Sequence, residues 1–481
     1  METVLEDLRK QYTPLIVKPY FIFLISFLVL VISFLLRGFV LSGEEPHFFY
    51  RISEFIVSNG IPSYDYLSFG GRFFLYPLGT PILLFILNQL FKVSLTNLIV
   101  FIPLILGFLD LILVYLIFKK FKLSRGTLSA ICYFLLLSPP LIYISNYLGY
   151  STIPFFLNLL AFYFIVTQKS ILRLVSFLIY LTLPFFGFIH VFFGMILLLF
   201  YFLKYEKLSK FFPFLAIVFV ASVINLKFLT KFGFGAVSYP ARDLIFAISG
   251  SYGFSIFLIF LFIFGISLIW KNGKYKNNFV YLFILINLLV LYLNFKYIVY
   301  ANLILVVVAA YGLKNVYKMK WSSLLIKNLT IIILISGVIF SGFSFIHENS
   351  DVSPTPQLKN ALEFLNDKTN PRDVILSHQM YGVYINSIAK RKNFVDSNSA
   401  YAPQSDTRLY TLDKLFYSKS LDFALESFSE FKISYILITP EMKNGLVWSR
   451  NNEGLLYLLK NNPDVFKMIY NNEGVEIWRI R

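Results

Sequence analysis

Residues 22–39, IFLISFLVLVISFLLRGF, form an apolar run, and residues 43–79, GEEPHFFYRISEFIVSNGIPSYDYLSFGGRFFLYPLG, follow it as a long polar loop. The apolar run is long enough to cross a bilayer. The loop holds four of the few carboxylates that precede the last third of the chain: Glu44, Glu45, Glu54 and Asp65. Because carboxylates are costly near hydrocarbon, we expect these to serve a function, and we predict that this loop carries the chemistry.

The composition indicates a polytopic α-helical membrane protein. Of 481 residues, 57% are hydrophobic, 19% aromatic and 14% charged, whereas a soluble domain has about 25% charged residues. Repeated apolar runs of about 17–22 residues predict membrane helices. We expect about 11 spans, near 20–40, 97–118, 126–143, 152–167, 171–184, 186–203, 211–230, 251–270, 277–294, 297–313 and 325–346. A shorter run, 77–92, is expected to form an interfacial helix.

The loop charges predict how these spans are oriented. The net charge is +17, and most of the excess precedes Asp351, where 27 basic residues accompany 11 acidic ones. With a cytoplasmic N-terminus, every predicted inner loop is basic, in agreement with the positive-inside rule. Counting 77–92 as a further span would invert the later loops. The excess therefore predicts a multi-pass protein of the cell membrane and not nucleic-acid binding.

Two regions are expected. Residues 1–347 form a transmembrane domain with a first outer loop at 43–96, and the first apolar run lacks a clear cleavage site, which indicates a signal anchor. A Ser/Pro-containing linker then leads into residues 348–481, a small soluble extracytoplasmic domain of mixed α/β type. Its pattern predicts helices at 356–368, 405–430 and 453–461, strands at 373–377 and 432–439, and a closing hairpin around the turn NNEG.

Carboxylates in and near the membrane part are scarce. Those at or beyond the predicted outer face are Glu44, Glu45, Glu54, Asp65, Asp243 and Glu348, and Asp110 lies within a span. A carboxylate at a span end can act as a general base or hold a cation, but it can also simply be solvated. Asp65 suits a turn, Asp243 could pair with Arg242, and Asp110 could hydrogen-bond to a neighbouring helix.

Outer cations are also few: Arg51, Arg72, Lys231, Arg242 and Lys296. They suit a phosphate or pyrophosphate group, although snorkelling at a span end would explain each one singly. His190, near the outer end of a span, is either a packing residue or a substrate contact. The single cysteine, Cys132, excludes an intramolecular disulfide. The sequence contains no P-loop, Rossmann fingerprint, HExxH or serine-nucleophile motif.

Two segments resemble the oligosaccharyltransferase catalytic subunit family. EPHFFYR (45–51) is similar to that family's D-P-W-F-N-Y-R, with Glu45 at the acidic position, and YPLG (76–79) is similar to its Y-P-x-G. Residues 374–400 resemble its S-W-W-D-Y-G-Y segment and the sequence beyond it. The shared positions there are Ser377, Tyr381, Gly382, Ile385, Ile388, Ala389, Arg391, Asp396 and Asn398.

The resemblance implies a membrane glycosyltransferase of GT-C type that takes a sugar from a polyprenyl phosphate or pyrophosphate donor. Glu45 matches the catalytic acid, and it would also hold a divalent metal if one is used. Our leading hypothesis adds Asp243 as a second acid. It assigns donor-phosphate or substrate binding to Arg51, Arg242, Lys296, His190 and Tyr76. The expected partners are the lipid-linked donor, membrane lipid and a glycan or protein acceptor outside.

The chain also departs from the family pattern. The peptide-reading W-W-D is replaced by His378, Gln379 and Met380, residues 145–153 lack the second acidic motif, and Arg-Phe before a late span is Asn294-Phe295. These differences argue against the usual sequon peptide as acceptor and weaken the case for a metal. The alternative hypothesis is a degenerate relative that binds lipid-linked glycans or protein partners without turnover. A transporter would be expected to show a paired broken-helix pattern or an inverted repeat, and the sequence shows neither.

Overall fold

The computed structural model describes residues 18–226, 230, 253–273, 278–398, 402, 404–450 and 452–481. The chain divides into two compact units. We call the first the helical unit, and it comprises Met1–Val40, Pro77–Thr80 and Asn97–Asp351. We call the second the sheet unit, and it comprises Leu41–Tyr76, Pro81–Thr96 and Val352–Arg481. Most of the predicted outer loop thus shares a unit with the C-terminal region.

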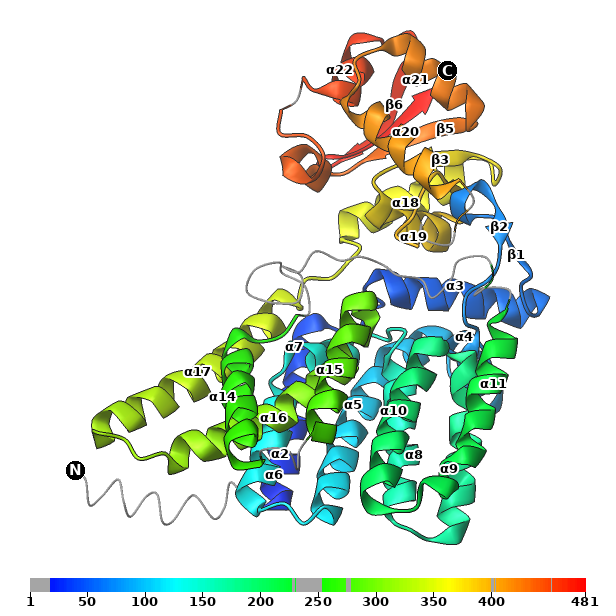
Figure 1. Cartoon of the computed structure of the whole chain (residues 1–481). Helices are drawn as coiled ribbons and strands as arrows, with labels where there is room; N and C mark the ends of the chain where they lie inside the picture. The colour runs from blue at the N-terminus through cyan, green and yellow to red at the C-terminus, as the bar shows by residue number, and fades with distance from the viewer. Residues whose placement is uncertain are drawn as a thin grey trace. The chain divides into compact units, whose positions relative to one another are not determined.

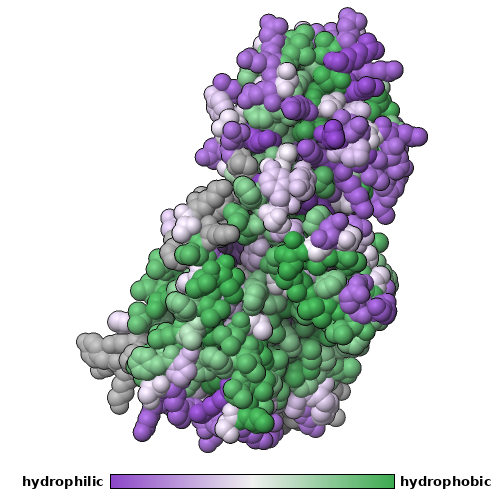
Figure 2. Space-filling model, turned by 90° about the vertical axis from the view of Figure 1, so that its right-hand side faces the viewer, coloured by the Kyte–Doolittle hydropathy of each residue, from purple (hydrophilic) through white to green (hydrophobic). Residues whose placement is uncertain are grey.

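The helical unit contains an apolar helix for each of the predicted spans (Figure 1). These helices are α2 (Pro19–Arg37), α5 (Leu95–Lys120), α6 (Arg125–Leu136), α7 (Pro139–Asn146), α8 (Thr152–Val166), α9 (Ser170–Thr182), α10 (Phe188–Tyr205), α11 (Leu215–Ile224), α14 (Ile256–Gly273), α15 (Asn278–Leu293), α16 (Ile298–Lys318) and α17 (Leu324–Glu348). Their outer surface is largely hydrophobic (Figure 2), as expected for helices that face lipid.

Fewer of these helices are long enough to cross a membrane than the sequence predicted. Among the described residues, five meet the length and hydropathy expected of a span, namely α2, α5, α10, α16 and α17, and the bent pair α6–α7 would make a sixth. The pair bends by 59° where Pro139 and Pro140 begin α7. Proline lacks the N–H that would continue the helix, so an apolar run need not be one straight span.

Close contact between α14 and α16 depends on two glycines. A Cβ atom at Gly312 would lie 2.1 Å from the carbonyl oxygen of Leu261, and one at Gly265 would lie 2.3 Å from that of Val308. Both distances are far below van der Waals contact. Small residues allow membrane helices to approach this closely, so either substitution with alanine would push the two helices apart.

The sheet unit begins with α3 (Glu44–Asn59), a short hairpin of β1 (Tyr64–Asp65) and β2 (Arg72–Phe73), and α4 (Gly79–Phe91), whose first two residues belong to the helical unit. At 13 residues, α4 is about 20 Å long, which is less than the thickness of the hydrocarbon core. It is therefore shorter than a straight span, and its place at the membrane interface stays a prediction.

The rest of the sheet unit is a mixed five-stranded sheet with helices (Figure 1). The strand order is β4-β3-β5-β7-β6, in which β3 is parallel to β4 and β5, while β7 is antiparallel to β5 and β6. The strands are β3 (Val374–Leu376), β4 (Lys392–Asn393), β5 (Ile433–Ile438), β6 (Phe466–Asn472) and β7 (Val475–Ile480), and the main helices are α18 (Pro356–Lys368), α20 (Ser405–Tyr417), α21 (Leu421–Glu430) and α22 (Gly454–Asn461).

These elements follow the predicted ones closely, including the hairpin. Glu473 and Gly474 connect β6 to β7 with φ angles of 47° and 86°, the left-handed conformation that a tight two-residue hairpin turn requires. One core residue comes from the first loop, because Phe69 is buried among the side chains of the sheet and its helices. This residue anchors the loop to the C-terminal fold.

Candidate active site

Helix α3 places Glu44 and Glu45 in its first turn, directly after Gly43, whose φ is 94°. Acidic side chains are favoured there because the backbone N–H groups at a helix N-terminus attract negative charge. Phe48 and Phe49 follow the two acids by four residues, so they lie one turn further along the same side of α3, and their burial fixes this end of the helix.

The surroundings of Glu44 raise the pKa of its side chain. Burial raises the pKa of Glu44 to about 7, the nearby carboxylates of Asp396 and Glu45 add to the rise, and a hydrogen bond with Ser397 offsets part of it. A carboxyl with a pKa near 7 can both accept and release a proton at neutral pH, as a general base requires. Glu44, to which no catalytic role was assigned from the sequence, can therefore serve as a general base beside Glu45.

Arg51 is held by an ion pair with Asp65. Its two terminal nitrogens donate to the two carboxylate oxygens at 2.7 and 2.6 Å, and both side chains are largely buried. Burial alone would raise the pKa of Asp65, but the Arg51 guanidinium more than reverses this and lowers it to about 2. Both terminal nitrogens are therefore engaged within the protein. Asp65 also accepts from the Leu67 N–H at 3.1 Å, so it fulfils the predicted turn role as well.

A second cluster joins the first loop to the segment after β4. Arg72 Nη1 and the Tyr76 hydroxyl each donate to the carbonyl oxygen of Asn398 at 3.0 Å. The Asp396 carboxylate, 2% exposed, lies 3.8 Å from Arg72 Nη2. It accepts hydrogen bonds from the Ser68 hydroxyl, the Asn393 amide and the Asn398 backbone N–H. Asp396 and Asn398 are two of the positions that carry the family resemblance.

Arg72 retains more hydrogen-bonding capacity than Arg51, in which Nε alone donates no hydrogen bond to the described residues. The Nε and Nη2 of Arg72 are buried and donate no hydrogen bond to any residue that the structure describes. Its guanidinium lies over the rings of Phe69 and Tyr76, at 5.3 and 4.9 Å from their centroids. Buried donors without acceptors are costly, and a guanidinium of this kind suits a phosphate or carboxylate oxygen. The sequence showed Arg72 as an outer cation but gave no reason to choose it over Arg51.

Two other predicted residues lie together in the helical unit. His190 on α10 is buried, and its Nδ1 is 2.8 Å from the hydroxyl of Tyr300 on α16. The Lys296 ammonium is 3.8 Å from the centroid of the Tyr150 ring. The Phe193 ring stacks on that of Tyr300 at 4.2 Å. His190 thus has the internal partner expected of a packing histidine, while Lys296 has an aromatic contact near the start of α16.

The structure does not test the predictions for Arg242, Asp243 and a metal ion. Arg242 and Asp243 lie outside the described residues, so the second acid stays a prediction. Within the ranges that the structure describes, no group of three or more His, Cys, Asp or Glu side chains is arranged to hold a metal ion. A divalent metal at Glu45 therefore stays a prediction, and we derive no chemical step through one.

No family model and no curated protein matches the sequence. Among solved structures, the chain is similar to the oligosaccharyltransferase AglB from Archaeoglobus fulgidus in complex with an inhibitory peptide and a dolichol-phosphate. The TM-score is 0.61, with 12% identity, over 95% of this chain and 74% of that one. It is also similar to ArnT from Cupriavidus metallidurans bound to undecaprenyl phosphate, with a TM-score of 0.51 and 11% identity over 94% and 96% of the two chains.

The chain has the fold of the GT-C glycosyltransferases. The resemblance found in EPHFFYR and in residues 374–400 is therefore confirmed at the level of the fold. A further AglB structure, a complex with zinc and sulfate, matches with a TM-score of 0.55 and 13% identity, over 94% of this chain and 73% of that one. Together with the apolar helices, the GT-C fold indicates a multi-pass membrane protein.

Proposed function

We propose that the protein transfers a sugar or glycan from a polyprenyl phosphate or pyrophosphate donor to an acceptor outside the cell. The observation that carries this proposal is the combination, in a GT-C fold, of two acids at the start of α3 with a buried arginine that has unused donors, all in one unit. The matching structures of AglB and ArnT with polyprenyl phosphates support a lipid-linked donor. The proposed orientation rests on the basic loops predicted to be cytoplasmic, from which we infer that α3 and the C-terminal region lie outside.

In the proposed reaction, a nucleophilic atom of the acceptor attacks the anomeric carbon of the donor sugar, and the bond from that carbon to the phosphate oxygen breaks. Glu45 takes the proton of the acceptor, with Asp243 as a second acid. Negative charge builds on the departing phosphate, and cations in a site with little water stabilise it strongly. We assign that role to Lys296 and Arg242, with Tyr76 and His190 as further contacts, and we add Arg72.

The geometry also changes the proposed role of Arg51. Asp65 engages both terminal nitrogens of Arg51. We therefore propose that Arg51 positions α3 against the β1–β2 hairpin. Its positive charge would stabilise the donor phosphate electrostatically more than through direct hydrogen bonds. Arg72 is the better ligand for the phosphate, because it is buried and two of its nitrogens donate no hydrogen bond to described residues.

The test is Glu45→Gln in a transfer assay with lipid-linked sugar and membranes that contain the full-length protein. We expect transfer to fall about 100-fold or more, because general-base catalysis contributes about 10²–10⁴. Glu54→Gln is the matched control, since Glu54 lies on the same helix but is 41% exposed and pairs with Lys390. Transfer by Glu45→Gln at the rate of this control would rule out the assigned role. Glu44→Gln, tested alongside, decides which of the two acids takes the proton.

The alternative is a relative that binds lipid-linked glycans without turning them over. Two observations favour it, namely the replacement of W-W-D by His378, Gln379 and Met380 and the lack of a carboxylate in residues 145–153. The two functions separate in a single-turnover experiment. Protein that retains polyprenyl-linked sugar, and releases it unchanged in the presence of a broad mixture of acceptor glycans and peptides, would support the binding function.

A further inference from the structure

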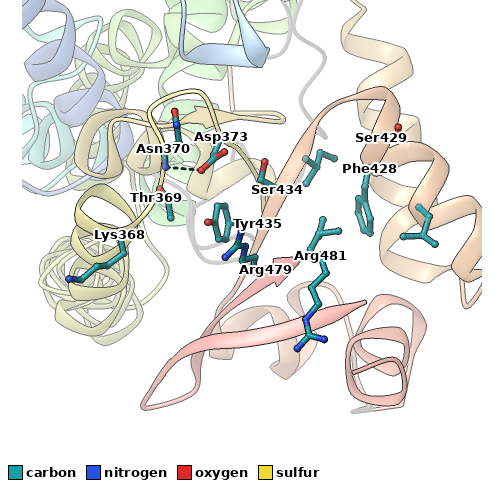
Figure 3. Close-up of a pocket in the computed structure, with 13 residues that line it drawn as sticks. Lys368, Thr369, Asn370, Asp373, Phe428, Ser429, Ser434, Tyr435, Arg479 and Arg481 are labelled. Carbon is teal, nitrogen blue, oxygen red and sulfur yellow. Dashed lines mark hydrogen bonds between the residues drawn. The ribbon is translucent and has the colours of Figure 1, made fainter. Parts of the chain in front are cut away.

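The sheet unit has a second concave site, a pocket of about 660 Å³ (Figure 3). It lies where β3 and β5 begin and β7 ends, between the loop that follows α18 and the end of α21. Its volume falls within the range of sites that hold small molecules. Asp396 and Asn398 follow β4, which runs parallel to β3, so they lie beyond the opposite ends of these strands. The pocket is therefore separate from the candidate active site.

The pocket wall carries an excess of positive charge. Lys368, Arg479 and Arg481 line it, all three are exposed, and their side chains form no ion pair or hydrogen bond with the described residues. By contrast, Lys443, near the other end of β7, is paired with Glu476 at 2.5 Å. The region from Asp351 onward is almost neutral, with 16 basic and 15 acidic residues, so the excess is a property of this pocket.

The same wall carries groups that suit sugar hydroxyls. Asp373 is the one acidic side chain in the lining, and one of its oxygens accepts from the Asn370 N–H at 2.7 Å, which fixes its direction (Figure 3). Tyr435 lies beside both Asp373 and Arg479. Ser429 and Ser434 add two hydroxyl groups to the lining. Hydroxyls, a carboxylate and an aromatic ring together can donate to and accept from several sugar hydroxyls at once.

We propose that this pocket binds an acidic saccharide, such as a uronic acid unit of an oligosaccharide. Arg479 and its neighbouring cations bind the sugar carboxylate, with the fork of a guanidinium suited to both carboxylate oxygens. Asp373 accepts hydrogen bonds from the sugar hydroxyls. A simple inorganic anion would be repelled by Asp373 and would leave the hydroxyl groups unused, and a lipid tail would find a mainly polar wall. The inference concerns binding and does not require that the protein transfer sugar.

The first experiment measures binding to full-length protein in phosphatidylcholine nanodiscs, which avoid sugar-based detergents. Trigalacturonate is the probe, and calorimetry gives its affinity. We expect Arg479→Gln to weaken binding about tenfold or more, the usual loss for a hydrogen-bonded charge pair. Arg450→Gln is the matched control, because Arg450 is also exposed on the sheet unit but does not line the pocket. Circular dichroism checks that each variant folds.

Three other ligands decide the chemical class. Maltotriose has the hydroxyls without the acid, inorganic phosphate has the charge without the hydroxyls, and triglutamate is an acidic peptide. We expect each to bind at least about tenfold more weakly than trigalacturonate, because each lacks part of the pattern. Phosphate or triglutamate binding as tightly as trigalacturonate would overturn the proposal, and so would trigalacturonate binding that Arg479→Gln leaves unchanged or no trigalacturonate binding at millimolar concentration.

In Asp373→Asn, the direction of the change in trigalacturonate affinity distinguishes a saccharide site from a surface that binds any anion. The asparagine oxygen can still accept from the Asn370 N–H, so the loop is preserved. If Asp373 accepts from sugar hydroxyls, the loss of its charge weakens trigalacturonate binding about fivefold. If the pocket is only an anion-binding surface, the same change strengthens binding and overturns the proposal. Glu45→Gln should bind trigalacturonate like the wild type, so a failed transfer assay and a failed binding assay can be told apart.

Discussion

Arg51 and Asp65 in the sheet unit form a buried ion pair at 2.6 Å, whereas His190 and Tyr300 in the helical unit form a buried neutral hydrogen bond at 2.8 Å. The helical unit also has an ion pair, Arg173 with Glu206 at 2.5 Å, between the start of α9 and the end of α10. Elsewhere in that unit, Asn146 donates to Ser33 and Asn302 donates to Ser138. In the sheet unit, charged side chains such as Arg72 and Asp396 approach each other.

The difference follows from the surroundings of each unit. A charge inside a bilayer is expensive, so helices that face lipid are joined mainly by packing and by neutral polar groups. A domain in contact with water can bring an ion pair to a partly buried place at lower cost, and the pair then fixes loops in position. Glu45 and Arg72 of the proposed chemistry lie in the sheet unit, where charged side chains are less costly to hold than inside a bilayer.

The largest expected effect comes from Asp65→Asn, which leaves the Arg51 guanidinium buried without its countercharge. Breaking a buried ion pair by removing one partner costs about 3–5 kcal/mol. We expect the sheet unit to lose stability of that order. The measurement is unfolding in urea followed by the fluorescence of Trp448, which is fully buried in the sheet unit, in a background whose other tryptophans are phenylalanine.

The control for this variant is Glu54→Gln, whose exposed pair with Lys390 should contribute less than about 1 kcal/mol. The pH dependence gives a second check. Because the pKa of Asp65 is lowered to about 2 in the folded state, its contribution is full above about pH 4 and is lost as pH falls toward 2. Asp65→Asn should lack this acid-side loss. An equal effect of both variants would contradict the assignment.

A smaller effect on stability is expected at Glu44, and its dependence on pH is opposite to that of Asp65. Its pKa is raised to about 7, so its contribution to stability is full below about pH 4.5 and is lost as pH rises through 7. The shift corresponds to at most about 3 kcal/mol, since each pKa unit is about 1.4 kcal/mol. Glu44→Gln should therefore flatten the difference in unfolding midpoint between pH 5 and pH 8. Parallel pH curves for the variant and the wild type would show that Glu44 is not shifted.

The helices and strands of each unit were predicted from the sequence more successfully than the contacts between residues that are far apart along the chain. Apolar runs and period-two patterns are local, and they placed α18 at 356–368 and the strand at 433–438 almost to the residue. The Phe69 N–H, by contrast, donates to the Asn393 side chain across 324 positions of the chain. No local pattern indicates such a contact, because it depends on the path of the whole first loop.

The same reason explains the two changes in the candidate site. Asp65 was expected to be a turn residue, and only the fold brings its carboxylate to Arg51. Arg72 looked like any cation near a membrane surface until Asn398 and Asp396 were found beside it. Glu45 could be predicted as a catalytic acid because it belongs to the motif EPHFFYR. Glu44 became a candidate only because its burial in the fold raises its pKa. The predicted span at 126–143 corresponds to α6 and α7, but its 59° bend at Pro139 and Pro140 was not predicted, since hydropathy ignores helix direction.

The smallest expected effect concerns the neutral hydrogen bond between His190 and Tyr300 in the helical unit. Tyr300→Phe removes the hydroxyl that meets His190 Nδ1, and a hydrogen bond between membrane helices contributes about 1 kcal/mol. Cys132 is the only cysteine of the sequence and is buried in the helical unit, so its reaction with a fluorogenic maleimide on heating reports the unfolding of that unit. Tyr292→Phe is the control, because Tyr292 is 81% exposed. We expect Tyr300→Phe to lower the midpoint by a few degrees relative to this control. A loss as large as that of Asp65→Asn would mean that the helical unit depends on polar pairs as strongly as the sheet unit does.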